Sequence, residues 1–182
     1  ALPSTQELII AYLPTHTHIV NNEHSIEFDM DEENFIAVDN KRYKLKQLHF
    51  HADSEHTING KQFPAEMHLV HEAADGQLAV IALLIEIGDS SVYDHIFDKI
   101  PRLGEEIKVD LHLEKFIPEN KARYSYNGSL TTPPCSENVL WLVFKQHLSV
   151  PLRQLQKFKA YYSHNYRPIQ KNYERHIYFT NY

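Results

Sequence analysis

The stretch QLHFHADSEH, residues 47–56, contains three histidines and two acidic residues. Successive side chains of a β-strand point to opposite faces. On a strand, His49 and His51 therefore share one face, whereas Leu48 and Phe50 take the other face and belong in the core. Two imidazoles held two residues apart on a rigid strand can converge on one metal ion.

A second stretch, EMHLVH at residues 66–71, offers a third ligand, because Glu66, His68 and Val70 share one face if it forms a strand. The dipeptide Asn59–Gly60 lies between the two stretches and is typical of a tight turn. We therefore expect the two strands to pair as antiparallel neighbours. The sequence predicts one zinc ion per chain, bound by three histidines: His49, His51 and His68.

The predicted ligands have supporting groups nearby. Metal-bound imidazoles usually donate their second ring N–H to an acceptor, and Gln47 and Glu66 stand two residues before His49 and His68. Three histidines without a fourth protein ligand leave a coordination position open for water, as catalytic zinc sites do.

A second pair of histidines, His16 and His18, occurs in the stretch THTH at residues 15–18. Its neighbours are threonines, and no carboxylate or amide lies close in the sequence. Two histidines on an exposed strand face are most often ordinary polar residues. We therefore expect no catalytic metal at this pair.

The composition is that of a globular protein. The 182 residues suit one domain, and 42% hydrophobic and 12% aromatic content argue against disorder. The net charge of −6 argues against nucleic acid as a partner. The longest apolar run, residues 78–85, is too short to span a bilayer. The first ten residues lack the basic segment of a signal peptide, and the single cysteine excludes an internal disulfide.

Alternating patterns dominate the chain and predict a β-rich α+β fold: a single domain, residues 1–182, built on a large twisted, mostly antiparallel central sheet with short peripheral helices. The strand-like stretches are residues 24–30, 44–52, 65–73, 77–87, 138–146 and 175–181. Turn signals stand at residues 59–60, 75–76 and 127–128, and short helices are expected at residues 91–100 and 151–162.

Four separated blocks resemble the α-class carbonic anhydrases. They are NNEHSIEF (21–28), QLHFHADSEHTINGKQFPAEMHLVH (47–71), YNGSLTTPPCSENVLW (126–141) and NYRPIQ (165–170). The resemblance implies reversible hydration of carbon dioxide to bicarbonate and a proton through a zinc-bound hydroxide, with lyase activity and carbon dioxide and bicarbonate as the small-molecule partners.

The resemblance also implies roles for individual residues. Gln47 and Glu66 would accept hydrogen bonds from the zinc ligands, and the backbone carbonyl of Asn165 would do so for His51. Thr131 and Glu55 would form a gate pair that orients the hydroxide, because a threonine oxygen can accept its proton while donating its own to a carboxylate. The remaining roles are a buried structural histidine, His56; a proton shuttle, His24; and an apolar pocket for carbon dioxide formed by Val70, Val80, Leu130, Thr132, Val139 and Trp141.

The chain also departs from the family pattern. Glu23 replaces the glycine that precedes the shuttle histidine, and the chain lacks the family's N-terminal segment. In secreted and bacterial members, that segment often holds a disulfide partner for the cysteine aligned with Cys135, so Cys135 is expected to be a free thiol here. The resemblance implies a cis bond between Pro133 and Pro134. It also implies export to the periplasm or outside the cell, and the missing segment predicts an exposed surface through which chains could associate.

Two other functions compete with the enzyme. One is a carbonic-anhydrase-like binding module, or a truncated form with impaired activity. All three zinc histidines are present, which disfavours an inactive relative. The other is a structural zinc protein, which the open coordination position disfavours.

Overall fold

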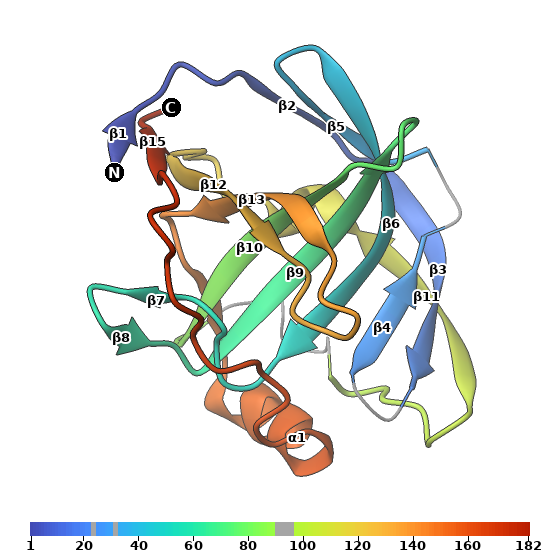
Figure 1. The fold of residues 1–182 in the computed structure, drawn as a ribbon. Helices are drawn as coiled ribbons and strands as arrows, with labels where there is room; N and C mark the ends of the chain where they lie inside the picture. Colours follow the sequence, from blue (N-terminus) through green and yellow to red (C-terminus); the bar gives the residue numbers. More distant parts are fainter. Residues whose placement is uncertain (23–24, 31–32, 90–96) are drawn as a thin grey trace.

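The computed structural model describes residues 1–22, 25–30, 33–89 and 97–182. Within these residues, the elements follow the chain in an order dominated by strands (Figure 1). The strands are β1 (Leu2–Pro3), β2 (Leu8–Ala11), β3 (Pro14–Asn21), β4 (Ile26–Asp29), β5 (Phe35–Val38), β6 (Lys41–His51), β7 (Thr57–Ile58), β8 (Lys61–Gln62), β9 (Ala65–Ala73), β10 (Leu78–Ile87), β11 (Glu106–His112), β12 (Arg123–Ser129), β13 (Glu137–Phe144), β14 (Leu148–Val150) and β15 (Tyr178–Thr180). The helices are the 3-10 helix η1 (Leu113–Phe116) and the α-helix α1 (Leu152–Tyr161).

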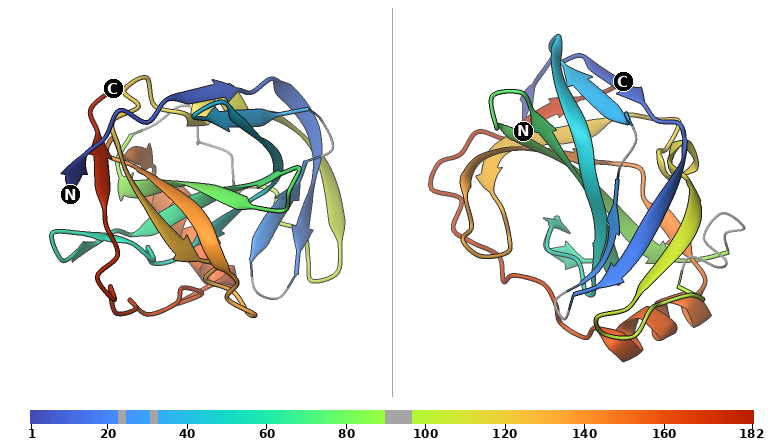
Figure 2. Two further views of the ribbon diagram at one scale, coloured as in Figure 1. Left: turned by 45° about the horizontal axis from the view of Figure 1, so that its top comes forward. Right: turned by 90° about the vertical axis from the view of Figure 1, so that its right-hand side faces the viewer.

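A 13-stranded sheet in the order β1-β15-β12-β13-β10-β9-β6-β4-β3-β11, with β2, β5 and β14 attached beside it, forms the body of the molecule. Most neighbours pair antiparallel, and β10 pairs parallel with both β13 and β14. The sheet is strongly twisted, so that β3 and β11 run at a steep angle to β12 and β13 (Figure 2). The predicted fold class is confirmed.

The helix predicted at residues 151–162 is confirmed as α1, which begins directly after Pro151. Proline fits there because the first turn of a helix needs no backbone donor at that point. Most of the other predicted helix, residues 91–100, lies outside the described residues. The predicted cis bond between Pro133 and Pro134 is present, and Cys135 is a free cysteine.

The turns predicted at residues 59–60 and 75–76 are confirmed, and the turn predicted at residues 127–128 is wrong. Asn59 and Gly60 both have positive φ, at 52° and 77°, and join β7 to β8. Asn127–Gly128 lies instead inside β12, paired with β13. A Cβ at Gly128 would lie 2.7 Å from the Tyr126 side chain and 2.9 Å from the Trp141 ring. Close packing, and not a turn, therefore explains this glycine.

The core on one side of β6 contains Leu48 and Phe50, which are 0% and 1% exposed, as the alternation predicted. The ring of Phe50 packs edge-to-face against Phe97 and Phe158, and Phe158 belongs to α1. This packing fixes the end of β6 against the helix. The histidines of β6 consequently point to the opposite side of the sheet.

Candidate metal centre

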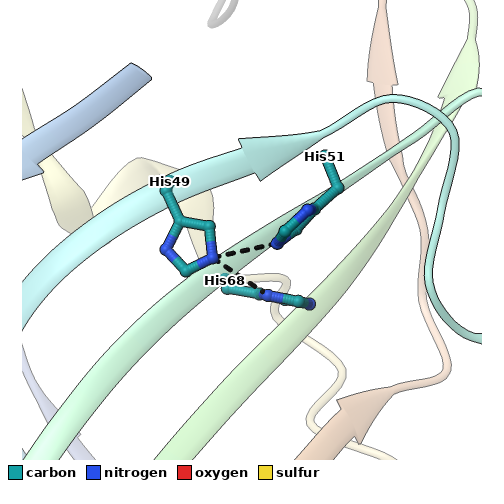
Figure 3. A group of neighbouring side chains, drawn as sticks. All are labelled: His49, His51 and His68. Carbon is teal, nitrogen blue, oxygen red and sulfur yellow. Dashed lines mark hydrogen bonds between the residues drawn. The ribbon is translucent and has the colours of Figure 1, made fainter. Parts of the chain in front are cut away.

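The register between β6 and β9 brings the three predicted ligands together. His49 stands directly opposite His68, and His51 lies two residues further along the same face of β6. The three rings point toward one another (Figure 3). Nε2 of His49 lies 3.0 Å from Nε2 of His51 and 3.3 Å from Nδ1 of His68. The predicted antiparallel pairing is therefore confirmed.

The other ring nitrogen of each histidine meets an acceptor. Nδ1 of His49 lies 2.7 Å from Oε1 of Gln47, and Nε2 of His68 lies 2.7 Å from Oε1 of Glu66. Nδ1 of His51 lies 2.7 Å from the backbone carbonyl oxygen of Asn165. These are the three acceptors named from the sequence.

Because a carbonyl and a carboxylate only accept, these contacts assign the ring protons to the outer nitrogens. In neutral rings the three inner nitrogens then face one another with lone pairs, so the short contacts drawn dashed in Figure 3 have no proton to share and are spaced as metal ligands would be. Four tetrahedral ligands at 2.0–2.1 Å from zinc stand about 3.3 Å apart. The donor set and its spacing therefore fit a zinc ion held by His49, His51 and His68.

Burial favours the neutral, ligating form of these imidazoles. Burial, together with the neighbouring His68 and His51, lowers the pKa of His49 well below its usual value. Burial and the neighbouring His68 also lower the pKa of His51. A neutral imidazole keeps the lone pair that a metal ion requires.

Glu66 is a fully buried carboxylate with four hydrogen bonds. Oε1 accepts from His68 and from Nδ1 of His56, the latter at 2.5 Å. Oε2 accepts the backbone N–H groups of Glu55 and His56, both at 2.8 Å. Burial alone would raise the pKa of Glu66, but His56 and His68 with their hydrogen bonds hold it well below its usual value. The carboxylate therefore stays ionised beside the centre.

His56 links Glu66 to strand β12, because its Nε2 lies 2.7 Å from the hydroxyl of Tyr126. The resemblance implied that His56 is buried, and its side chain, which is 17% exposed, is partly buried. Sequence reasoning missed Tyr126 as its partner, because Tyr126 lies 70 residues further along the chain.

Glu55 points one oxygen at the centre. Its Oε2 lies 3.6 Å from Nε2 of His51 and 4.0 Å from Nδ1 of His68, and has no hydrogen-bond partner among the described residues. Its Oε1 accepts the backbone N–H of Arg167 at 2.7 Å, a contact that the sequence did not suggest. The gate pair with Thr131 stays a prediction.

Apolar residues predicted for the pocket lie together beside the centre. Val70, Val80, Val139 and Trp141 belong to one buried cluster, against which the partly buried Leu130 packs. The Trp141 ring lies 4.9 Å from the His68 ring, centroid to centroid. Thr132 is exposed and Thr131 partly buried. His24 lies outside the described residues.

The second histidine pair, His16 and His18, has acidic partners that come from β11. Nδ1 of His16 lies 2.5 Å from Asp110, and Nδ1 of His18 lies 3.1 Å from Glu106. Sequence inspection found no acid near this pair because the partners arrive by strand pairing. Within the described residues, the groups able to hold a metal are His49, His51 and His68, and the overlapping set His56, Glu66 and His68.

The structure thus combines a large twisted sheet, three converging imidazoles that could hold a metal ion, and an adjoining apolar cluster. The model of the eukaryotic-type carbonic anhydrase family matches residues 3–181. The chain belongs to this family, and the resemblance seen in the sequence is confirmed.

Individual proteins similar to this chain are also carbonic anhydrases. A carbonic anhydrase from Pectobacterium carotovorum is 36% identical, covering 90% of this chain and 69% of the relative. One from Nostoc sp. is 34% identical, covering 92% of this chain and 66% of the relative. The solved structure of an α-carbonic anhydrase from Thermovibrio ammonificans with the inhibitor sulfanilamide is 35% identical, has a TM-score of 0.91, and covers 98% of this chain and 81% of that one.

The chain thus spans about two thirds of the length of these curated relatives. Among the described residues, no helix is both long and apolar enough to cross a membrane.

Proposed function

We propose that this chain catalyses the reversible hydration of carbon dioxide to bicarbonate and a proton, with one zinc ion bound by His49, His51 and His68. The observation that carries the proposal is the convergence of three ring nitrogens, 3.0 and 3.3 Å apart, whose opposite nitrogens are each engaged by an acceptor. Membership of the carbonic anhydrase family supports the same reaction.

Bound zinc would supply a water of pKa about 7 and thereby a nucleophile at neutral pH. The chain's own residues hold the geometry. Gln47, Glu66 and the carbonyl of Asn165 fix the three ring orientations. Such acceptors also raise the basicity of the ligands they contact.

Glu55 would orient a hydroxyl group at the centre. The backbone N–H of Arg167 fixes its Oε1, so the buried Oε2 has a defined direction. We propose that Oε2 accepts the hydroxyl proton of Thr131, which leaves the threonine oxygen as an acceptor for the attacking group.

Carbon dioxide has no charge and no net dipole, so an apolar wall is the surface that suits it. That wall would be formed by Val70, Val80, Leu130, Val139 and Trp141. His24 would carry the proton between the centre and solvent. We also propose export to the periplasm or outside the cell, on the family resemblance alone.

The test combines metal analysis with a stopped-flow assay of carbon dioxide hydration. The parent chain should bind one zinc per chain and hydrate carbon dioxide, and His68→Ala should lose both properties. His16→Ala, a change in the exposed second histidine pair, should retain both. Full zinc content and activity in His68→Ala would refute the assignment, and zinc binding without hydration by the parent would favour the binding-module alternative.

A further inference from the structure

Asn165 is tied to three consecutive residues at the end of β6. Its carbonyl oxygen accepts from Nδ1 of His51, and its own backbone N–H donates to the carbonyl of Ala52 at 3.2 Å. Its side-chain Oδ1 accepts the backbone N–H of Ala52 at 2.7 Å. Its side-chain Nδ2 donates to the carbonyl of Phe50 at 3.1 Å.

The backbone carbonyl at position 165 does not require asparagine, because every residue has one. The side-chain contacts do require it. A carboxamide carries an acceptor and a donor on the same carbon, and here they engage the N–H of Ala52 and the C=O of Phe50, which flank His51. Aspartate keeps the acceptor but lacks the donor, and leucine of similar size has neither.

We propose that the Asn165 side chain is a positioning residue of the metal centre: by clamping the peptide groups on both sides of His51, it holds its own carbonyl against Nδ1 and so aims Nε2 at the metal. This inference rests on the proposed function, because it takes His51 as a zinc ligand. The clamp joins residues 114 positions apart in the chain.

The same segment also holds the oriented carboxylate. Arg167, two residues after Asn165, donates its backbone N–H to Oε1 of Glu55 at 2.7 Å. Movement of the segment would therefore displace Glu55 together with the acceptor of His51. The inference accordingly predicts lower turnover as well as weaker zinc binding when the clamp is removed.

The test compares two variants, Asn165→Leu and Asn165→Asp, with a control at Asn34. Asn34 is a buried asparagine beside the same strand: its backbone carbonyl accepts the N–H of Leu45 in β6, and its side-chain Oδ1 accepts the backbone N–H of Leu13, both at 2.7 Å. Asn34→Leu removes the side-chain hydrogen bond of a buried asparagine that lies beside the same strand but away from the three histidines. Zinc affinity is measured by competition with a chelator, and the stability of the metal-free chain by urea unfolding.

Asn165→Leu should raise the zinc dissociation constant by about ten-fold or more, the scale for lost support of a ligand. Asn165→Asp should raise it less, and Asn34→Leu should lower stability without changing zinc affinity. Unchanged affinity in Asn165→Leu, or an equal loss in Asn34→Leu, would overturn the inference. If Asn165→Leu does not fold, Asn165→Ser is judged by the same two outcomes. A parent chain that binds no zinc would instead refute the proposed function.

Discussion

Oε1 of Glu66 lies 2.7 Å from Nε2 of His68, and Glu66 is itself fully buried, so one ionised carboxylate orients a proposed zinc ligand from inside the protein. It differs from the other two acceptors, Gln47 and the Asn165 carbonyl, because it carries a full charge. A charged acceptor makes the stronger hydrogen bond and raises the basicity of its histidine.

Glu66→Gln should therefore weaken zinc binding by about 10- to 100-fold, the usual effect of changing such an acceptor. A chelator competition assay measures the change. Glu72→Gln is the control, since Glu72 belongs to the same strand but lies partly exposed beside Lys46. Equal zinc affinities of Glu66→Gln and the parent would show that the negative charge of Glu66 does not strengthen zinc binding.

His24→Ala should lower kcat in dilute buffer and leave kcat/KM for carbon dioxide nearly unchanged. Direct loss of a proton from an acid of pKa about 7 to water proceeds at only about 10³ s⁻¹, whereas the reaction can reach about 10⁶ s⁻¹ with a relay. Added imidazole should restore much of the loss, and Glu23→Gly should shift the pH dependence of kcat. An unaltered kcat at low buffer would assign the relay to another residue.

Gly128→Ala should destabilise the fold by about 1–3 kcal/mol, the usual cost of an overpacked site. The added Cβ would lie 2.7 Å from Tyr126 and 2.9 Å from Trp141, and the Trp141 ring adjoins His68. Thermal unfolding measures the effect. Asn127→Ala, at the exposed neighbouring position of β12, should change the melting temperature far less; similar shifts would contradict the packing argument.

His71 should make stability depend on pH. Burial lowers its pKa to about 3, and its Nε2 lies 2.7 Å from the hydroxyl of Tyr12. In the unfolded chain its pKa is about 6.5. At pH values between these two pKa values, only the unfolded state binds this proton. The contribution of His71 to the free energy of unfolding is therefore fully present above about pH 6.5, and it falls by up to about 1.4 kcal/mol per pH unit as the pH decreases below that value.

His71→Gln removes this contribution, so its stability should fall less steeply than that of the parent between about pH 6 and pH 4. Urea unfolding of the metal-free proteins at several pH values provides the comparison. Parallel profiles would mean that residue 71 binds a proton equally in both states.

The sequence predicted the features that depend on strand alternation. A period of two fixes which side chains share a face of a strand. The alternation therefore predicted correctly that Gln47, His49 and His51 share one face of β6 and that Glu66 and His68 share one face of β9. The Asn127–Gly128 turn was wrong because that signal does not distinguish a glycine that needs positive φ from one that needs space.

Contacts between distant segments had no local signature. The acids beside His16 and His18 come from β11, and the hydroxyl beside His56 comes from β12. The side-chain clamp of Asn165 was missed for the same reason, although the family resemblance named its backbone carbonyl. Pairing between segments far apart in sequence is decided by the tertiary fold and not by any window of residues.

The long separation between His51 and its acceptor has a consequence during synthesis. A ribosome adds about 5–20 residues per second, so the 114 positions that separate His51 from Asn165 require about 6 to 23 s. All three histidines of the proposed zinc site are thus synthesised well before the Asn165 carbonyl, which contacts Nδ1 of His51. If zinc binds as proposed, tight binding would therefore come late, after the C-terminal part of the polypeptide has been made and has packed against β6.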